Sequence, residues 1–283
     1  MRDMREISVL KIRDTVYDLC LKANFELRKD VLSSIRSAYK KETGTRAKGI
    51  LKLIIENAGI ARNKKIAICQ DTGMVSVFLD IGIDVRMTGG NLTDAVNEGA
   101  ARAYDKGFLR KSVVDDPILR NNTRTNTPCV IFTDIVEGDK VKITVSPKGF
   151  GSENKSRIKM FNPTSPVEDI KKFVIDVVRD AGPDACPPLV LGIGIGGTFE
   201  KAAYLAKKAI TNPIDKKNAK RHIARLEKDL EKEINALGIG PMGLGGKTTV
   251  FGINILEYPT HIAGLPVAVN VSCHATRGAS KVL

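Results

Sequence analysis

The chain has 283 residues, 42% of them hydrophobic and 27% charged, so it is long enough for a substantial core and has the composition of an ordinary globular protein. No apolar run approaches the roughly 20 residues that span a bilayer, and the acidic, interrupted start MRDMREISVLKIRD argues against a secretory signal, so we expect a cytoplasmic protein. The formal net charge is +13, but dispersed basic residues and an aromatic content of 5% favour a solvated basic surface over a nucleic-acid site.

The first part of the chain predicts helices followed by short strands. Apolar residues recur at helical spacing over 5–41, with a break near 24–30 that can divide the stretch into two helices. The next predicted elements, in chain order, are a helix over 47–58 that ends near Gly59, a strand over 64–69, a turn at 70–73 and a strand over 74–85. A polar cap, Asn91 or Thr93, and a stop at Gly107 delimit the helix that follows.

The second part of the chain continues this mixture. Two β-rich runs on either side of a turn at 137–140 predict a hairpin over 129–149. Ser165, Pro166 and Glu168 form the pattern of a capping box with a proline at the first helical position, which predicts a helix. The remaining predicted elements are a buried strand over 187–197, helices over 198–210 and 217–236, and strands over 248–258 and 265–273.

These elements mix helices and strands without a fixed-period repeat, a low-complexity linker or a clean domain boundary. We therefore expect an α+β protein in which helices flank mixed sheets. We assign residues 1–283 to a single domain.

The five cysteines are widely spaced, and their odd number in an unsecreted protein argues against a disulfide framework. Cys20 lies in the apolar stripe of a helix and Cys129 begins a strand, so we interpret both as core residues. Cys69, Cys186 and Cys273 instead lie at strand ends or in a loop beside polar residues. Each alone is typical of a structural cysteine, but the three together favour one shared site.

Three thiolates suggest either zinc or an iron–sulfur cluster. Zinc sites usually contain close pairs such as C-x-x-C, and this sequence has none. A [4Fe–4S] cluster usually takes four cysteines, so a site with three would leave one iron without a protein ligand. Such an iron could bind a substrate oxygen as a Lewis acid.

Several stretches together resemble one family. They are ICQDTG, LRKSVVDDPILRNNTRTNTP, KGFGSENKS, DACPP, GIGIGGTFEKAAYLAKKA and THIAGLPVAVNVSCHATR. In this order they are similar to the class I, iron–sulfur-dependent fumarate hydratases, and more narrowly to the α subunit of the two-subunit form. The same stretches are similar to the α subunit of L-tartrate dehydratase. The resemblance runs from about residue 7 to the C-terminus.

The resemblance implies that Cys69, Cys186 and Cys273 hold a [4Fe–4S] cluster with an open iron. It implies the reversible hydration of fumarate to (S)-malate, a reaction of the tricarboxylic acid cycle. It also implies a catalytic role for Asp71, which would orient the bound hydroxyl or move its proton. The residues implied to bind the dicarboxylate substrate are Gln70, Arg110, Gly149, Gly151 and His261.

One-chain members of this family have a second domain that contributes further carboxylate-binding residues and the proposed proton-transfer group. This chain ends ten residues after Cys273. The resemblance therefore implies half of an active site, completed by a β subunit in a hetero-oligomer. No general base is assigned in this chain.

Two glycine-rich stretches offer a rival interpretation, a basic protein that binds a nucleotide. Gly192, Gly194 and Gly197 fit a dinucleotide fingerprint, but no acid ends a second strand about twenty residues later. We favour a glycine turn that lets a helix start close to a sheet. The stretch GPMGLGGKTT nearly matches a phosphate-binding loop, but Pro241 stands where that pattern requires glycine.

Overall fold

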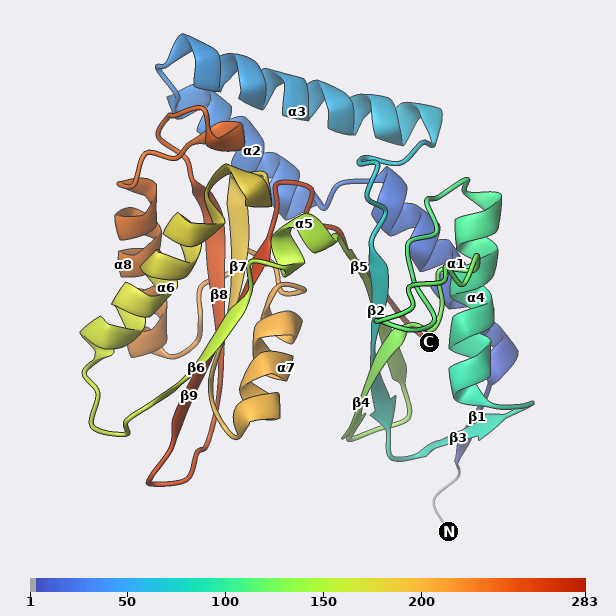
Figure 1. The fold of residues 1–283 in the computed structure, drawn as a ribbon. Helices are drawn as coiled ribbons and strands as arrows, with labels where there is room; N and C mark the ends of the chain where they lie inside the picture. The colour runs from blue at the N-terminus through green and yellow to red at the C-terminus, as the bar shows by residue number, and fades with distance from the viewer. Residues whose placement is uncertain (1–3) are drawn as a thin grey trace. The chain divides into compact units, whose positions relative to one another are not determined.

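A computed structural model describes residues 4–283, and the chain folds into two units (Figure 1). The first unit contains the chain up to Arg28, Ala58–Phe150 and Arg277–Leu283, and the second contains Lys29–Asn57 and Gly151–Thr276. In each unit helices flank a sheet with both parallel and antiparallel pairs, which confirms the predicted α+β class. Each unit combines segments that lie far apart in the sequence.

The first unit contains a four-stranded sheet in the order β10-β5-β2-β4 and a parallel pair, β1 with β3. Its elements are β1 (Arg5–Ser8), α1 (Val9–Phe25), β2 (Met74–Gly82), β3 (Val85–Thr88), α4 (Leu92–Lys106), β4 (Val130–Val136), β5 (Val141–Lys148) and β10 (Ala279–Val282). The chain passes between the units within α3 (Thr45–Lys64) and within the one-turn helix α5 (Phe150–Glu153).

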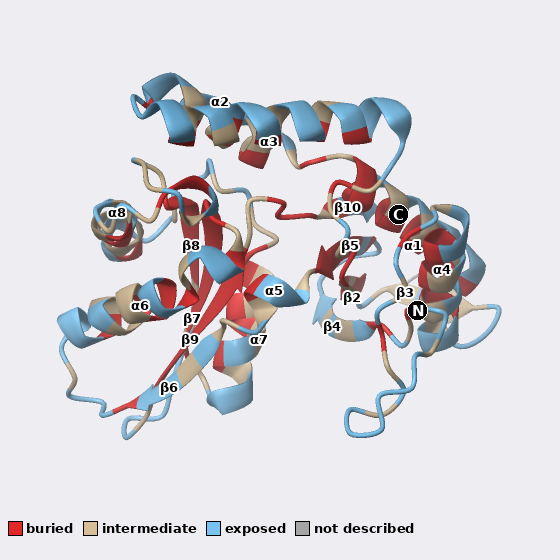
Figure 2. Ribbon diagram, turned by 45° about the horizontal axis from the view of Figure 1, so that its top comes forward, coloured by how far each residue is buried: buried red, intermediate tan, exposed pale blue. Residues whose placement is uncertain are grey.

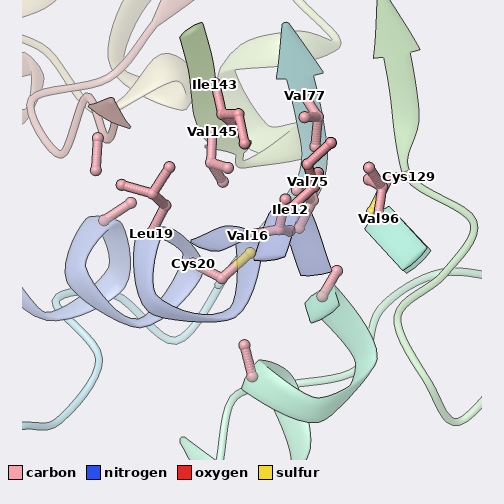
Figure 3. Packing of buried hydrophobic residues seen from close by; sticks show 14 of the residues in the cluster. Ile12, Val16, Leu19, Cys20, Val75, Val77, Val96, Cys129, Ile143 and Val145 are labelled. Carbon is pink, nitrogen blue, oxygen red and sulfur yellow. The ribbon is translucent and has the colours of Figure 1, made fainter. Parts of the chain in front are cut away.

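The core of the first unit forms where α1 meets the sheet. Side chains of a strand alternate between its faces, so Val75, Val77 and Leu79 of β2 lie on one face and are almost fully buried. Ile12 and Val16, one turn apart on α1, pack against them (Figure 3). Full burial of each such side chain stabilises the fold by about 1.5–3 kcal/mol. Tyr104 of α4 completes this core.

The second unit contains a four-stranded sheet in the order β6-β9-β7-β8. Its elements are α2 (Lys29–Lys41), β6 (Arg157–Phe161), α6 (Val167–Ala181), the 3₁₀ turn η1 (Gly182–Ala185), β7 (Leu189–Gly196), α7 (Phe199–Ala209), α8 (Arg221–Asn235), the 3₁₀ turn η2 (Pro241–Gly243), β8 (Val250–Tyr258) and β9 (Leu265–Ser272). Helices α6 and α8 pack on one face of the sheet, and α7 packs on the other (Figure 1). Figure 2 shows buried residues along β7 and β9 and exposed residues on the outer sides of these helices.

The glycines of β7 allow α7 to pack closely against the sheet. A Cβ on Gly192 would lie 2.1 Å from the carbonyl oxygen of Ala206, and one on Gly194 would lie 2.1 Å from that of Ala202. Any side chain at these positions would force α7 away from β7. Gly192 and Gly194 of the pattern that resembled a dinucleotide fingerprint therefore have a packing role, but within strand β7 and against the body of α7 rather than in a turn where the helix starts.

The predicted hairpin over 129–149 is wrong, although both of its strands form. β4 and β5 do not pair with each other, because β2 lies between them in the sheet. Ser76–Gly82 of β2 pair in parallel with β4. On its other side, β2 pairs antiparallel with β5. Strand propensity and a turn signal indicate two strands, but an earlier strand takes the position between them.

Four local predictions also need correction. Arg5–Ser8 forms strand β1 rather than the start of a helix, and α3 extends through Gly59 to Lys64. Residues 64–69 form no strand: buried Ile68 donates its backbone N–H to the carbonyl of Asn24 instead (3.0 Å). The predicted capping box is absent, because α6 begins after Pro166 without a side-chain cap.

The other predicted helices and strands form within a few residues of their expected limits. No helix within residues 4–283 is both long and apolar enough to cross a bilayer.

Glu42 anchors the loop that nearly matched a phosphate-binding motif. Its buried carboxylate accepts hydrogen bonds from the backbone N–H groups of Thr43 and Gly44 (both 2.8 Å) and of Lys247 (2.7 Å). Burial alone would raise the pKa of Glu42, but these N–H donors bring the pKa below its usual value. A phosphate-binding loop donates its backbone N–H groups to the ligand. In this loop the N–H of Lys247 is instead donated to the Glu42 carboxylate of the same chain.

We predict that Glu42→Gln lowers the free energy of unfolding by about 2 kcal/mol, because a neutral amide replaces a charged acceptor of three N–H donors. Because the folded pKa is lowered, the Glu42 contribution is present above the usual glutamate pKa and is lost as the pH falls through the folded value. Urea unfolding at neutral and acidic pH measures both effects. Glu56→Gln, which removes an exposed ion pair with Lys52, is the control and should change little. Equal stability of Glu42→Gln and the wild type at neutral pH would contradict this prediction.

Candidate active site

The buried phenol of Tyr104 holds the far end of the turn that begins at Cys69. Half-buried Cys69 donates its thiol to Gln70 Oε1 (3.2 Å), and exposed Gln70 follows it in the turn. The hydroxyl of Tyr104 donates to the carbonyl oxygens of Thr72 (2.6 Å) and Gly73 (2.9 Å). Burial raises the pKa of Tyr104 above its usual value, so the phenol stays a proton donor.

Asp71 joins this turn to a second predicted site segment. Its Oδ1 accepts from the N–H of Gly73 (2.9 Å), and its Oδ2 accepts from the N–H of Phe150 (2.8 Å). Glycine at position 149 gives Asp71 room for this approach, because a Cβ there would lie 3.0 Å from Asp71 Oδ2, a tight contact that would force the carboxylate to shift. The structure therefore brings together Asp71 and Gly149, which the sequence places 78 residues apart.

The loop that contains Arg110 is fastened to the same turn. The Thr72 hydroxyl donates to the carbonyl of Arg110 (2.7 Å), and the amide of buried Asn126 donates to the carbonyl of Gly73 (3.1 Å). Oδ1 of Asn126 also accepts the backbone N–H of Ser112 (2.7 Å). Asn126 therefore links the chain just after Arg110 to the Cys69 turn. Arg110 itself is exposed, so its charge is available to an anion beside the turn.

Cys186 and Cys273 lie together in the second unit. Cys273 follows β9, and the next residue, His274, donates its backbone N–H to the carbonyl of Cys186 (3.2 Å) while its Nδ1 lies 3.0 Å from the same oxygen. Cys186 has a left-handed backbone (φ 52°) after η1 and precedes β7, the neighbour of β9. Antiparallel pairing of these strands thus brings two thiols 87 residues apart to one end of the sheet.

Gly151 lies close to the Cys186 segment, whereas His261 lies at the opposite end of β9 from Cys273. Gly151 is exposed in the short helix α5, and a Cβ on it would lie 3.7 Å from the carbonyl of Asp184, two residues before Cys186. His261 is exposed in the connection that precedes β9, whereas Cys273 follows that strand. A strand of eight residues spans about 25 Å. The structure therefore does not bring His261 to the Cys186–Cys273 pair of the same chain.

The cysteines divide as their sequence contexts predicted. Cys20 and Cys129 are buried in the first core, and burial raises the pKa of both thiols, to about 12 for Cys129. The other three are half-buried at strand ends or in turns. Because a thiolate is the form that binds a metal, the half-buried thiols are the better ligands.

The residues that fit a cluster come from both units. Among residues 4–283, no three or more His, Cys, Asp or Glu side chains are arranged as a metal site. Cys186 and Cys273 form a pair in the second unit, while Cys69 belongs to the first. The three half-buried thiols have the chemistry that such a cluster requires, because iron–sulfur clusters bind cysteine thiolates.

One polar residue near Asp71 was not among the predicted site residues. Arg277 is buried, and its Nη1 donates to the backbone carbonyl of Asp71 (2.7 Å) and to Oδ1 of Asn24 (3.2 Å). The only signal in the sequence was its position at the end of the stretch VSCHATR, four residues after Cys273. Neither its burial nor its contact with residue 71 could be read from that position.

Comparison with known proteins assigns the chain to a family. The sequence model of the family described as Fumarate hydratase (Fumerase) matches residues 13–282. A provisionally named L(+)-tartrate dehydratase subunit alpha of Methanocaldococcus jannaschii is 41% identical over 278 residues, which cover 96% of this chain and 97% of that protein. The L(+)-tartrate dehydratase subunit alpha of Escherichia coli K12 is 30% identical over 276 residues, which cover 96% and 91%. The chain therefore belongs to the class I fumarate hydratase family of hydro-lyases and is an α-subunit-type member of it.

Proposed function

We propose that this chain is the α subunit of a [4Fe–4S] hydro-lyase that catalyses the reversible hydration of fumarate to (S)-malate with a β subunit. The observation that supports the proposal is the closeness of two chain segments with half-buried cysteines: His274, the residue after Cys273, contacts the backbone carbonyl of Cys186. Cys69 heads the polar turn that contains Asp71. Family membership supports the same chemistry.

We propose one catalytic domain over residues 1–283. Each unit is assembled from separate segments, so neither can be removed as a continuous piece of chain. The proposed ligands also divide between the units, with Cys69 in one and the other two in the second. Loss of either unit would therefore remove part of the ligand set.

In this proposal Cys69, Cys186 and Cys273 hold the cluster. When bound, the cluster would supply a Lewis acid for the hydroxyl that is removed from, or added to, the substrate. Arg110, exposed beside the turn, binds a substrate carboxylate with its planar guanidinium. Gln70 is exposed in the same turn and offers its amide to the substrate.

Asp71 has two tasks in this proposal. Its two oxygens accept from the N–H groups of Gly73 and Phe150, which fixes its position and the backbone of Gly149. Each carboxylate oxygen has a second lone pair, so Asp71 can also accept a hydrogen bond from a substrate hydroxyl. The Gly149 and Gly151 backbones would line the substrate site near it.

Two parts of the site come from outside this chain in the proposal. His261 lies at the far end of β9 from Cys273, so it can reach a substrate at the cysteines only from another copy of the chain. The general base comes from the β subunit. Relatives named as α subunits, with nearly their whole length matched, favour such a hetero-oligomer.

L(+)-tartrate is the second candidate substrate. The relatives at 41% and 30% identity are both named L(+)-tartrate dehydratase subunit alpha. Tartrate carries a hydroxyl on each central carbon, so its dehydration needs the same removal of a hydroxyl and of a proton beside a carboxylate. Turnover of malate, fumarate and L(+)-tartrate by the anaerobically purified complex with the β subunit distinguishes the two activities.

We predict that Cys69→Ser, Cys186→Ser and Cys273→Ser each lose bound iron and visible absorbance, and lose activity by about 100-fold or more, because each removes a thiolate ligand. Cys20→Ala and Cys129→Ala are the controls: they should keep iron and activity and cost about 1 kcal/mol of stability. Iron and sulfide analysis of the anaerobic complex measures the first effect. Wild-type iron content in all three serine variants would refute the proposed ligand set.

We also predict that a thiol-alkylating reagent divides the cysteines in the folded, cluster-free chain. At mildly alkaline pH, Cys69, Cys186 and Cys273 should react, whereas Cys20 and Cys129 should react only after unfolding, because burial raises the pKa of both thiols. Mass spectrometry of peptides alkylated before and after addition of urea measures this difference. Early labelling of Cys129 in folded protein would contradict the prediction.

A further inference from the structure

Arg277 places a positive charge inside the first unit. The residue is 4% exposed, although arginine is rarely buried without a charged partner. It precedes β10, which pairs antiparallel with β5 and so fixes the start of the C-terminal segment. In the sequence it lies four residues after Cys273.

The guanidinium holds one end of the Cys69 turn, and Asn24 holds the other. Arg277 Nη1 donates to the carbonyl of Asp71 and to Oδ1 of Asn24. Fully buried Asn24 accepts the N–H of Ile68 on its own carbonyl (3.0 Å) and donates its side-chain amide to the carbonyl of Cys20 (3.0 Å). Residues 68–71 are therefore tied to the end of α1 on one side and to Arg277 on the other.

Hydrogen bonding alone does not explain a cation here. Both acceptors of Nη1 are neutral oxygens, and Nε has no hydrogen-bond partner within the described chain, residues 4–283. A buried charge with an unsatisfied donor destabilises a fold unless nearby negative charge offsets it. The Asp71 carboxylate is close by: the Cβ position of Gly149 lies 3.0 Å from Asp71 Oδ2 and 3.3 Å from Arg277 Nη2. Arg277 thus faces Asp71 across the space that glycine leaves open.

We propose that Arg277 is a positioning residue of the hydro-lyase site, which fixes the Cys69–Gly73 turn and orients the Asp71 carboxylate. This inference rests on the proposed function, because it assigns Arg277 to the site that holds the cluster and substrate. The rigid, planar guanidinium suits the task, since it presents several donors in one fixed geometry. A residue with only a packing role would need neither the charge nor the fork.

The test compares Arg277→Gln and Arg277→Lys with the wild type, each purified anaerobically as the complex with the β subunit. Glutamine keeps one donor group but no charge, and lysine keeps the charge but not the fork. Arg5→Gln is the matched control, because Arg5 also donates from Nη1 to backbone carbonyls of the first unit, those of Asp139 (3.1 Å) and Leu283 (3.4 Å). The readouts are thermal unfolding, iron per chain, the rate of cluster loss to a chelator, and kcat and KM.

We expect Arg277→Gln to lose its cluster to the chelator about 10–100-fold faster than the wild type, with a lower kcat and a smaller change in KM. The rate of cluster loss of Arg277→Lys should lie between those of Arg277→Gln and the wild type. Arg5→Gln should match the wild type in cluster retention and kinetics. A structural role alone would lower the unfolding temperature of both Arg277 variants without selective loss of the cluster.

Three outcomes decide between the inferences. A wild-type complex without iron refutes the proposed function itself. A loaded wild type whose Arg277→Gln variant retains the cluster and kcat within about twofold overturns the role of Arg277 alone. If Arg277→Gln does not fold, Arg277→Lys decides: faster cluster loss at an unchanged unfolding temperature supports the positioning role, and wild-type retention overturns it.

Discussion

One carboxylate organises the candidate site of the first unit. Asp71 accepts N–H groups from its own turn and from Phe150, so the residues before β2 and after β5 converge on a single side chain. The paired register of β2 and β5 brings these ends together, with Met74 opposite Lys148. Gly73 is required there, because a Cβ on it would lie 2.7 Å from the Lys148 backbone, and a Cβ on Gly149 would crowd Asp71 at 3.0 Å. The chemistry of the turn therefore depends on the pairing of two strands.

Buried side chains of the same unit hold the turn by hydrogen bonds to its backbone carbonyls. Tyr104 and Asn126 are buried polar residues whose side chains donate to the carbonyls of Thr72 and Gly73, so these oxygens are satisfied away from water. Arg277 adds a third donor at Asp71. Buried polar networks are rigid where their hydrogen bonds are satisfied, as at the carbonyls of residues 71–73, and Nε of Arg277 is the one atom named here without a partner within residues 4–283. Rigidity suits a turn that must present a ligand and a carboxylate in one orientation.

In the second unit, the sheet brings together two cysteines that are far apart in the sequence. Antiparallel pairing of β7 with β9 places the start of one strand beside the end of the other. Cys186 precedes the first strand and Cys273 follows the second, so sheet register alone brings them near each other. The glycines of β7 let α7 cover the sheet closely, and α6 and α8 cover the opposite face. Both cysteines lie at strand ends, outside the hydrophobic layers.

The class of fold, most helices and strands, and the division of the cysteines into two buried and three half-buried residues could be predicted from the sequence. These features follow from local periodicity and from the polar or apolar neighbours of each residue. Three features could not be predicted without the three-dimensional structure: β2 lies between β4 and β5, His261 and Cys273 lie at opposite ends of β9, and Arg277 is buried against Asp71. Strand order and buried polar contacts join residues far apart in the chain, and they depend on which surfaces pack together, which no local pattern encodes.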